Sequence, residues 1–229
     1  MASTSQTDVN QAAPSPRPEI EPVPTQEWYD RSSLSGDYMV MIEGQTEEDW
    51  WRYAPESRIC EYIDGIIYMP SPATAEHQDE VGFLFFLLTG FRYARGTGIV
   101  RTGPGVLQLA PGRNPEPDIF VLPLEGEPGP PALLVVEALS PSTRSHDLKR
   151  KAAIFQDAGI PEVLYVDLAK KRLAVLHKVA GQYRTDWQED GLWVSEALPG
   201  FWLDVAWLWD DPLPNALTCL ETILAGPTV

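Results

Sequence analysis

The sequence LLVVEALSPSTRSHDLKRK, residues 133–151, changes character halfway along its length. Its first half is a short apolar run with one acid, Glu137, and this run breaks at Ser-Pro-Ser-Thr. Charged residues follow, and among them Asp147 and Lys151 are spaced four apart. The apolar run predicts a strand buried on both faces, and the charged half predicts a helix. The stretch therefore predicts a strand–turn–helix unit that carries a carboxylate where the strand ends.

The chain before this unit predicts a hairpin, two helices and a further strand. Two β-rich runs flank Asp64-Gly65, a dipeptide that suits a two-residue type I′ turn. Residues 46–55 begin with a capping Thr and acids, which predicts a short helix. Residues 74–91 repeat apolar side chains at helical spacing, and the apolar run at 117–123 predicts another buried strand.

The chain after the turn predicts one more central strand and a second hairpin. Ser145 is expected to cap the charged helix, and Gly159 to stop it. A buried strand follows at 161–168, then a hairpin turning near Gly181, and a short helix near 213–225. This order predicts a mixed α/β (α+β) fold, with a central mixed β-sheet flanked by helices and an N-terminal β-hairpin.

Composition predicts one domain after a disordered tail. Residues 1–26 are rich in Ser, Pro, Gln and Glu, so they cannot bury enough apolar surface to fold, and we expect a single domain over 27–229. The net charge of −16 disfavours non-specific binding to nucleic acid. However, 13 of the 17 Lys and Arg residues lie between Arg92 and Arg184, which predicts either a locally positive surface or ordinary solvated helix faces.

Cysteine usage and apolar runs indicate the compartment. Cys60 and Cys219 make neither a disulfide framework nor a metal-type spacing, which favours a reducing compartment. The N-terminus lacks a signal-peptide pattern, and the apolar run at 83–88 is too short to span a bilayer. We therefore expect a cytoplasmic protein without a membrane partner.

Two predicted central strands each carry one acid, Asp118 at the start of the first and Glu137 at the end of the second. A lone buried carboxylate costs several kcal/mol, comparable with the net stability of a domain, so a cation, a Lys or Arg, or backbone N–H groups must compensate it. Adjacent strands can bring both acids together, and Mg²⁺ accepts such a pair with water and phosphate oxygens. The pair suits phosphodiester hydrolysis, in which Mn²⁺ can substitute for Mg²⁺.

A positive group beside the metal would hold or polarise the attacking water. Lys151 lies on the helix that follows the Glu137 strand, and Asp147 shares its helix face at i, i+4 spacing. The alternative for these two residues is an ordinary surface ion pair near a helix N-terminus.

Several motifs resemble the Uma2 (Uma-two) family of restriction endonucleases, which belongs to the PD-(D/E)XK nuclease superfamily. The resemblance covers residues 37–215 and implies a restriction-endonuclease-like core with Mg²⁺-dependent cleavage of DNA. The motifs that carry it are EYIDGIIYMPSP with EHQ after it, EPDIFVLP, VVEALSPSTRSHDLKRK, AGIPEVLYVD and LPGFWLDVAWLW.

The resemblance implies metal-ligand roles for Asp118 and Glu137. The superfamily usually places a lysine two residues after the second acid, where this chain has Leu139. Members of the Uma2 type instead carry an Asp and a Lys on the following helix, which match Asp147 and Lys151. The resemblance thus implies that Lys151 is the displaced catalytic lysine.

Other positions have open roles. Glu61 either faces the site from the hairpin or is a cross-strand or capping acid. His77 is either a satisfied core residue or a contact to phosphate or water in the site. The cations that follow the Glu137 strand, Arg144, Lys149 and Arg150, are candidate nucleic-acid contacts.

Two functions remain open from the sequence. The first is a Mg²⁺-dependent DNA endonuclease, which in some enzymes of this kind works as a homodimer. The second is a non-catalytic interaction module on a nuclease-like fold, which binds a protein partner or nucleic acid. The net charge, the Pro-rich tail and Leu139 favour the second.

Overall fold

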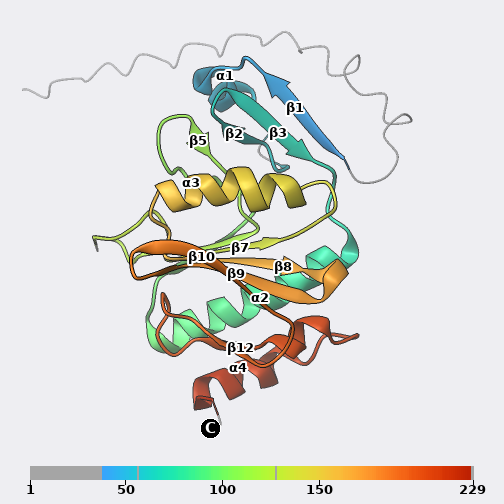
Figure 1. Cartoon of the computed structure of the whole chain (residues 1–229), viewed down its shortest axis with the longest axis vertical. Helices are drawn as coiled ribbons and strands as arrows, with labels where there is room; N and C mark the ends of the chain where they lie inside the picture. The colour runs from blue at the N-terminus through green and yellow to red at the C-terminus, as the bar shows by residue number, and fades with distance from the viewer. Residues whose placement is uncertain (1–37, 56, 127, 228–229) are drawn as a thin grey trace, which may run out of the picture. The chain divides into compact units, whose positions relative to one another are not determined.

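The computed structural model describes residues 38–55, 57–126 and 128–227, which lie in one compact unit (Figure 1). The predicted tail over 1–26 and the predicted start of the domain at residue 27 lie outside the described residues. No helix in the described part of the chain is both long and apolar enough to cross a membrane.

A six-stranded mixed sheet forms the centre of this unit, as the sequence predicts. Its strand order is β10-β9-β8-β7-β6-β4, and all neighbours are antiparallel except β7 and β8, which are parallel. The two central strands are apolar and buried along almost their whole length. The strands are β4 (Ile99–Thr102), β6 (Ile119–Leu122), β7 (Leu134–Ala138), β8 (Glu162–Asp167), β9 (Arg172–Val179) and β10 (Gln182–Gln188).

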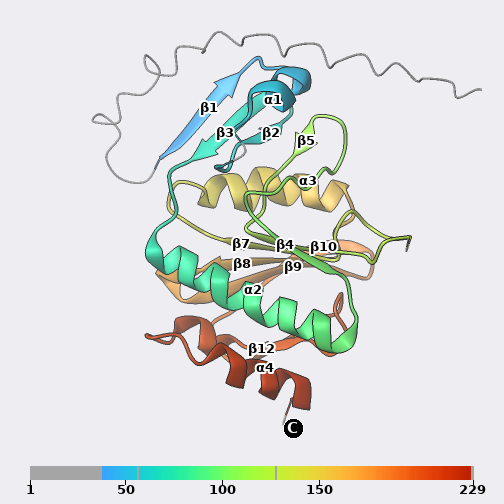
Figure 2. The same cartoon turned by 180° about the vertical axis from the view of Figure 1, so that it is seen from behind.

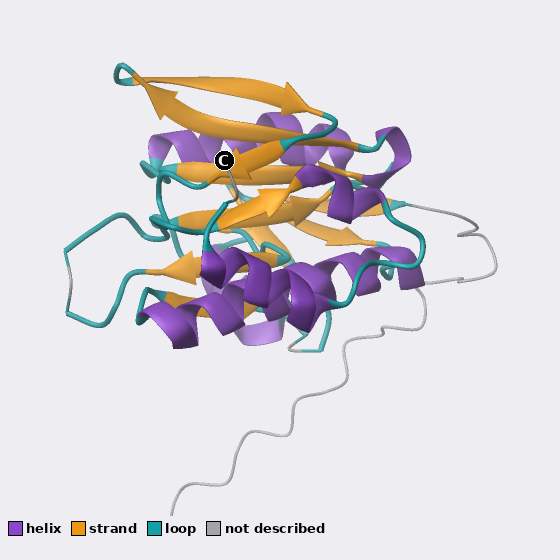
Figure 3. Cartoon of the chain, turned by 90° about the horizontal axis from the view of Figure 1, so that it is seen from below, coloured by secondary structure: helices purple, strands orange, loops and turns teal. Residues whose placement is uncertain are grey.

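Helices cover both faces of this sheet (Figures 1 and 2). One face packs on α2 (Ala75–Arg95), with α4 (Ala216–Ala225) on the far side of α2, and the other packs on α3 (Ala152–Asp157). Figure 3 views these layers from the α4 side, with helices and strands in different colours. Near α4, a two-stranded sheet is formed by β11 (Leu192–Val194) and β12 (Trp202–Asp204). Two short 3₁₀ helices are η2 (Leu168–Lys170), which follows β8, and η3 (Val205–Trp209), which follows β12.

The predicted N-terminal hairpin is the middle of a four-stranded sheet with the order β1-β3-β2-β5. Asp64 and Gly65 both have positive φ, 51° and 85°, as the predicted type I′ turn requires. Thr46 caps the predicted short helix by accepting the Asp49 backbone N–H, and the Trp50 indole donates to the Cys60 carbonyl. The elements of this layer are β1 (Met39–Glu43), α1 (Glu47–Tyr53), β2 (Glu61–Ile63), β3 (Ile66–Pro70) and β5 (Arg113–Asn114).

The turn after β7 differs from the prediction. Ser145 makes no capping hydrogen bond through its side chain, because its own backbone is already helical, with φ −70° and ψ −33°. The hydroxyls of Ser140 and Thr143 instead accept each other's backbone N–H. The predicted single α-helix also begins as a π-helix, η1 (His146–Lys151), before it continues as α3.

The packing of α2 on α4 depends on a glycine. A Cβ added at Gly90 would lie 2.3 Å from Leu220 Cδ2, whereas one added at Gly82 on the same helix meets nothing within 4 Å. We expect Gly90→Ala to lower the free energy of unfolding by about 1–3 kcal/mol through overpacking. Gly82→Ala should raise it by about 0.5–1 kcal/mol through helix propensity. Urea denaturation checks both, and equal effects of the two changes would contradict this account.

Candidate functional site

The ammonium of Lys151 is buried among three carboxylates. Its Nζ lies 2.5 Å from Glu137 Oε1, 2.7 Å from Glu61 Oε1 and 3.7 Å from Asp147 Oδ1. None of these four residues is more than 4% exposed. Asp147 and Lys151 are therefore not a surface ion pair, and that alternative is wrong. The strand end at Glu137, the hairpin strand β2 and the helix after the turn meet at one point.

The π-helix explains how one short segment delivers several groups to this point. A π-helix has a wider turn than an α-helix and bonds i to i+5, so residues four and five apart both fall on one face. Asp147 and His146 can thus both approach the side on which Lys151 lies. His146 Nε2 is 3.0 Å from Glu61 Oε2, and its side chain is 9% exposed. The sequence reasoning missed His146, because α-helical spacing places it on a different face from Lys151.

Glu61 is held on both of its oxygens. Oε2 faces His146, while Oε1 faces Lys151 and accepts the Glu116 backbone N–H at 3.0 Å. The structure thus places Glu61 inside the cluster, with partners from the helix and from the loop before β6. It is not a capping acid, since none of its hydrogen bonds in the described residues closes a helix end.

Asp118 lies beside Glu137 at the end of neighbouring strands. Ile119 pairs with Val136 in the antiparallel register of β6 and β7, which puts Asp118 next to Glu137. Asp118 Oδ2 accepts the Ala138 backbone N–H at 2.8 Å. This hydrogen bond fixes the carboxylate across the strand pair, at the sheet end that the sequence predicts.

His77 reaches Asp118 from the first turn of α2. Its Nε2 is 3.3 Å from Asp118 Oδ2, and its side chain is 18% exposed. Burial alone would lower the pKa of His77, but the hydrogen bond and charge of Asp118 outweigh burial and raise it. His77 therefore contacts a site acid at a partly open edge rather than lying in the apolar core.

The cluster carries more negative charge than Lys151 can balance. Burial, and the nearby carboxylates, hold the pKa of Glu137 well above its ordinary value. Burial also raises the pKa of Asp147 to about 6, while Lys151 and His146 outweigh burial at Glu61 and lower its pKa to about 2. The same carboxylates raise the pKa of Lys151, so it stays an ammonium. An excess of buried negative charge favours the approach of a cation.

The donor set suits a hard divalent ion. Asp118 and Glu137 offer carboxylate oxygens, and Mg²⁺ binds through one or two carboxylates with water and phosphate oxygens. Among the described residues, no group of three or more His, Cys, Asp or Glu side chains is arranged to hold a metal ion. Leu139 is buried in the apolar core beside α3, whereas the Lys151 ammonium stands beside Glu137.

Three further polar groups near the cluster escaped the sequence reasoning. Within the described part of the chain, Glu80 Oε1, Glu116 Oε2 and the Tyr165 hydroxyl are buried without a hydrogen-bond partner. Burial raises the pKa of Glu80 to about 8 and, with the charge of Glu61, that of Glu116 to about 7. Tyr165 lies opposite Glu137 in the parallel pairing of β7 and β8. Only Tyr165 has a sequence signal, a hydroxyl in an otherwise apolar run, whereas Glu80 and Glu116 stand among polar residues or prolines.

The three candidate nucleic-acid contacts separate in the structure. Arg144 Nη1 is 2.7 Å from Asp167 Oδ2, a carboxylate that also faces Arg172 Nε at 3.1 Å. Arg144 thus has a buried structural partner. Lys149 and Arg150 are exposed on η1.

Removal of the ammonium should be strongly destabilising. We expect Lys151→Met to lower the free energy of unfolding by about 3–5 kcal/mol at pH 8, because it leaves buried carboxylates unpaired. The loss should shrink towards pH 5, since Asp147, with a pKa of about 6, can then protonate. Urea denaturation at both pH values checks this, with Lys170→Met on the exposed η2 turn as the control. A pH-independent loss would contradict the shared-charge account.

Glu80 gives a second pH signature. Its folded pKa of about 8 lies above the ordinary 4.5, so the unfolded chain loses this proton first and stability falls as pH rises from about 4.5 to 8. The free energy of unfolding of Glu80→Gln should therefore exceed that of wild type by on the order of 1–4 kcal/mol at pH 8 and by almost nothing at pH 4.5. Denaturation curves across this range check it, against the exposed neighbour change Asp79→Asn. A gain of the same size at pH 4.5 would exclude burial of an ionisable group as its cause.

Comparison with known proteins identifies a family and a structure of similar fold. The model of the Uma2 family, described as "Putative restriction endonuclease", matches residues 46–206. A solved structure from Anabaena variabilis ATCC 29413, described as a "putative nuclease belonging to DUF820", superposes with a TM-score of 0.58 at 15% identity. That match covers 72% of this chain and 97% of the other and shows a shared fold. No curated protein matches the chain.

Proposed function

Because the chain belongs to the Uma2 family of restriction endonucleases, we propose that it is a metal-dependent endonuclease that hydrolyses phosphodiester bonds in DNA. One observation carries the proposal. The buried Lys151 ammonium lies 2.5 Å from Glu137, and Asp118 stands beside Glu137 on the neighbouring strand. Two carboxylates and a lysine at one sheet end are the groups that this hydrolysis needs.

Asp118 and Glu137 are the residues that would hold Mg²⁺, or Mn²⁺ in its place. When bound, the ion supplies a Lewis acid that lowers the pKa of water and stabilises charge on the phosphoryl group. The Ala138 backbone N–H holds Asp118 in place. This hydrogen bond leaves the second carboxylate oxygen of Asp118 available as a metal ligand, since only Oδ2 has a hydrogen bond or ion pair among the described residues.

Lys151 orients the attacking water in this proposal. It stays protonated, because Glu137, Glu61 and Asp147 all favour the ammonium. An ammonium donates hydrogen bonds and accepts none, so a water that accepts one from Lys151 would keep its second lone pair free to attack phosphorus. Glu61 and Asp147 act through Lys151 by fixing its position, and are positioning residues.

His77 contacts the substrate phosphate at the open edge of the site. Its side chain is 18% exposed, which is more than that of Asp118 or of any residue in the buried cluster around Lys151. The charge of Asp118 favours the protonated form of His77. A protonated imidazole beside a phosphate donates a charge-assisted hydrogen bond.

A non-catalytic module that binds a protein or nucleic acid is the second candidate. The observation that favours it is that Lys151 already has three carboxylate neighbours, so the cluster can serve as a buried structural network. Titration with Mn²⁺ separates the two, because a purely structural network has no need to bind the ion at Asp118 and Glu137. A homodimer that cuts both strands, and a cytoplasmic location, stay predictions.

Glu137 provides the decisive variant. We expect Glu137→Gln to lower Mg²⁺-dependent cleavage by at least about 100-fold, because it removes a proposed metal ligand. The variant should remain folded and be at least as stable at pH 8, since the raised pKa of Glu137 shows that its charge is unfavourable there. Plasmid and oligonucleotide cleavage at low salt measures the first effect, and urea denaturation measures the second.

The matched control is Glu221→Gln, which makes the same chemical change on the exposed side of α4. It should leave cleavage unchanged. Wild-type protein that cuts no DNA with Mg²⁺ or Mn²⁺, or a Glu137→Gln variant as active as wild type, would overturn the proposed function.

A further inference from the structure

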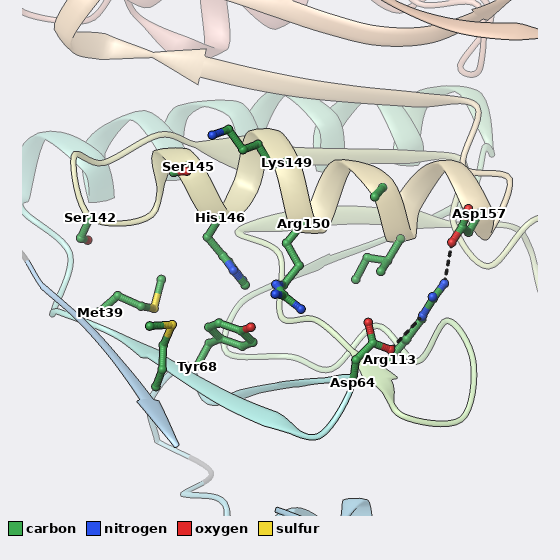
Figure 4. A pocket seen from close by; sticks show the side chains of 13 residues that line it. Met39, Asp64, Tyr68, Arg113, Ser142, Ser145, His146, Lys149, Arg150 and Asp157 are labelled. Atoms are coloured by element: carbon green, nitrogen blue, oxygen red, sulfur yellow. Dashed lines mark hydrogen bonds and ion pairs between the residues drawn. The ribbon is translucent and has the colours of Figure 1, made fainter. Parts of the chain in front are cut away.

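A recess lies between the N-terminal sheet and the helix that carries Lys151 (Figure 4). Its volume is about 690 Å³. The sheet side contributes Met39, Met41 and Tyr68, and the helix side contributes His146 and Arg150. Figure 4 shows His146 and Arg150 pointing from the helix towards Tyr68.

His146 belongs to both the recess and the buried cluster. It lines the recess, and its Nε2 is 3.0 Å from Glu61 in the cluster. Its ring lies against the Tyr68 ring, with centroids 4.2 Å apart. A ligand in the recess would therefore lie one side chain away from the partner of Lys151.

The recess has surplus positive charge on an acidic protein. Its acids, Asp64 and Asp157, are both taken by Arg113, at 3.3 and 2.8 Å. In the described part of the chain, no carboxylate lies within ion-pair distance of the other two cations, Lys149 and Arg150. Arg150 stands 5.5 Å from the centroid of the Tyr68 ring, and Lys149 also lines the recess, with its side chain directed away from Tyr68 in Figure 4. These two cations are available to an anionic ligand.

The apolar lining adds a second recognition element. Met41 is 61% exposed on the sheet side, and Met39 is half-buried beside it. Thioether side chains adapt their shape and contact aromatic rings favourably. A flat heterocycle bearing phosphate groups fits both features, because the ring can contact the methionines and the phosphates can bind the unpaired cations.

The size of the recess favours a single strand over a duplex. Pockets of about 300–1,000 Å³ hold one ligand of drug size, which corresponds to a nucleotide or two. The catalytic candidates Glu137 and Lys151 are buried, so a phosphodiester must leave the regular surface of a duplex to come near them.

We propose that the recess binds one unpaired DNA strand, with backbone phosphates on Arg150 and Lys149 and a base against Met41. The strand is held next to His146, at the entrance to the cluster. This inference rests on the proposed function for its choice of DNA, and it adds the substrate class, an unpaired or locally opened strand.

Binding without cleavage tests the recess separately from catalysis. The probe is a fluorescein-labelled 12-nucleotide single strand, or the same strand annealed as a duplex, titrated with the full chain in excess EDTA. We expect the single strand to bind more tightly than the duplex. The double variant Lys149→Glu/Arg150→Glu should weaken single-strand binding by at least tenfold. It should also reduce the log–log salt slope by about 1.4, which is two contacts at about 0.7 each.

The matched control is Lys170→Glu/Lys171→Glu, an adjacent exposed pair with the same charge change that does not line the recess. Its binding should stay within twofold of wild type. Equal losses of single-strand binding in both double variants would overturn the recess proposal. So would wild-type protein that binds the duplex more tightly than the single strand, if the recess variant binds the duplex as tightly as wild type does.

The two proposals fail in different ways. If wild type and the recess variant cut duplex DNA equally with Mg²⁺, the nuclease stands and the recess proposal falls. If no substrate is cut but the recess variant alone loses single-strand binding, the recess stands and the proposed catalysis falls.

Discussion

The buried ammonium of Lys151 is the interaction on which the site depends. A buried ion pair adds little net stability, because desolvation offsets the attraction, yet loss of one partner is strongly destabilising. Here one ammonium serves three carboxylates from a strand, a hairpin and a helix. It therefore fixes the relative positions of those three elements. Replacement of Lys151 by an apolar residue would leave the three carboxylates unpaired, so the acids and the lysine are explained together, and the proposed hydrolysis would use both.

Much of this arrangement could be predicted from particular residues. The apolar run that ends at Glu137 and the run that follows Asp118 become neighbouring strands, because a loop of ordinary length joins them. Buried acids need compensation by a cation, a Lys or Arg, or backbone N–H groups, and in the structure Lys151 is the group that compensates Glu137. Asp64 and Gly65 likewise predicted their turn, since few other dipeptides accept two successive positive φ angles.

Other features depend on contacts that no local pattern contains. An apolar stripe with α-helical period cannot distinguish a π-turn, so His146 could not be placed beside Glu61. β5 consists of two residues and pairs with β2 across about fifty residues of chain, which leaves no periodic signal. The recess exists only because the N-terminal sheet lies over the helix. The role of His77 also depended on the neighbour it met, Asp118, rather than on its own spacing.

In the proposed function, the charge of the cluster links cation binding to substrate binding. A phosphodiester brings further negative charge towards Glu137, whose pKa is already raised by burial and by the repulsion of neighbouring carboxylates. The cations of the recess lie outside the cluster, so a strand can bind to Arg150 without lifting that repulsion. The final approach of the phosphate then requires either a bound divalent ion or protonation of a carboxylate. Only the first would leave Glu137 ionised as a ligand, so in the proposed mechanism the strand binds at one surface and a bound ion would complete a separate reaction centre.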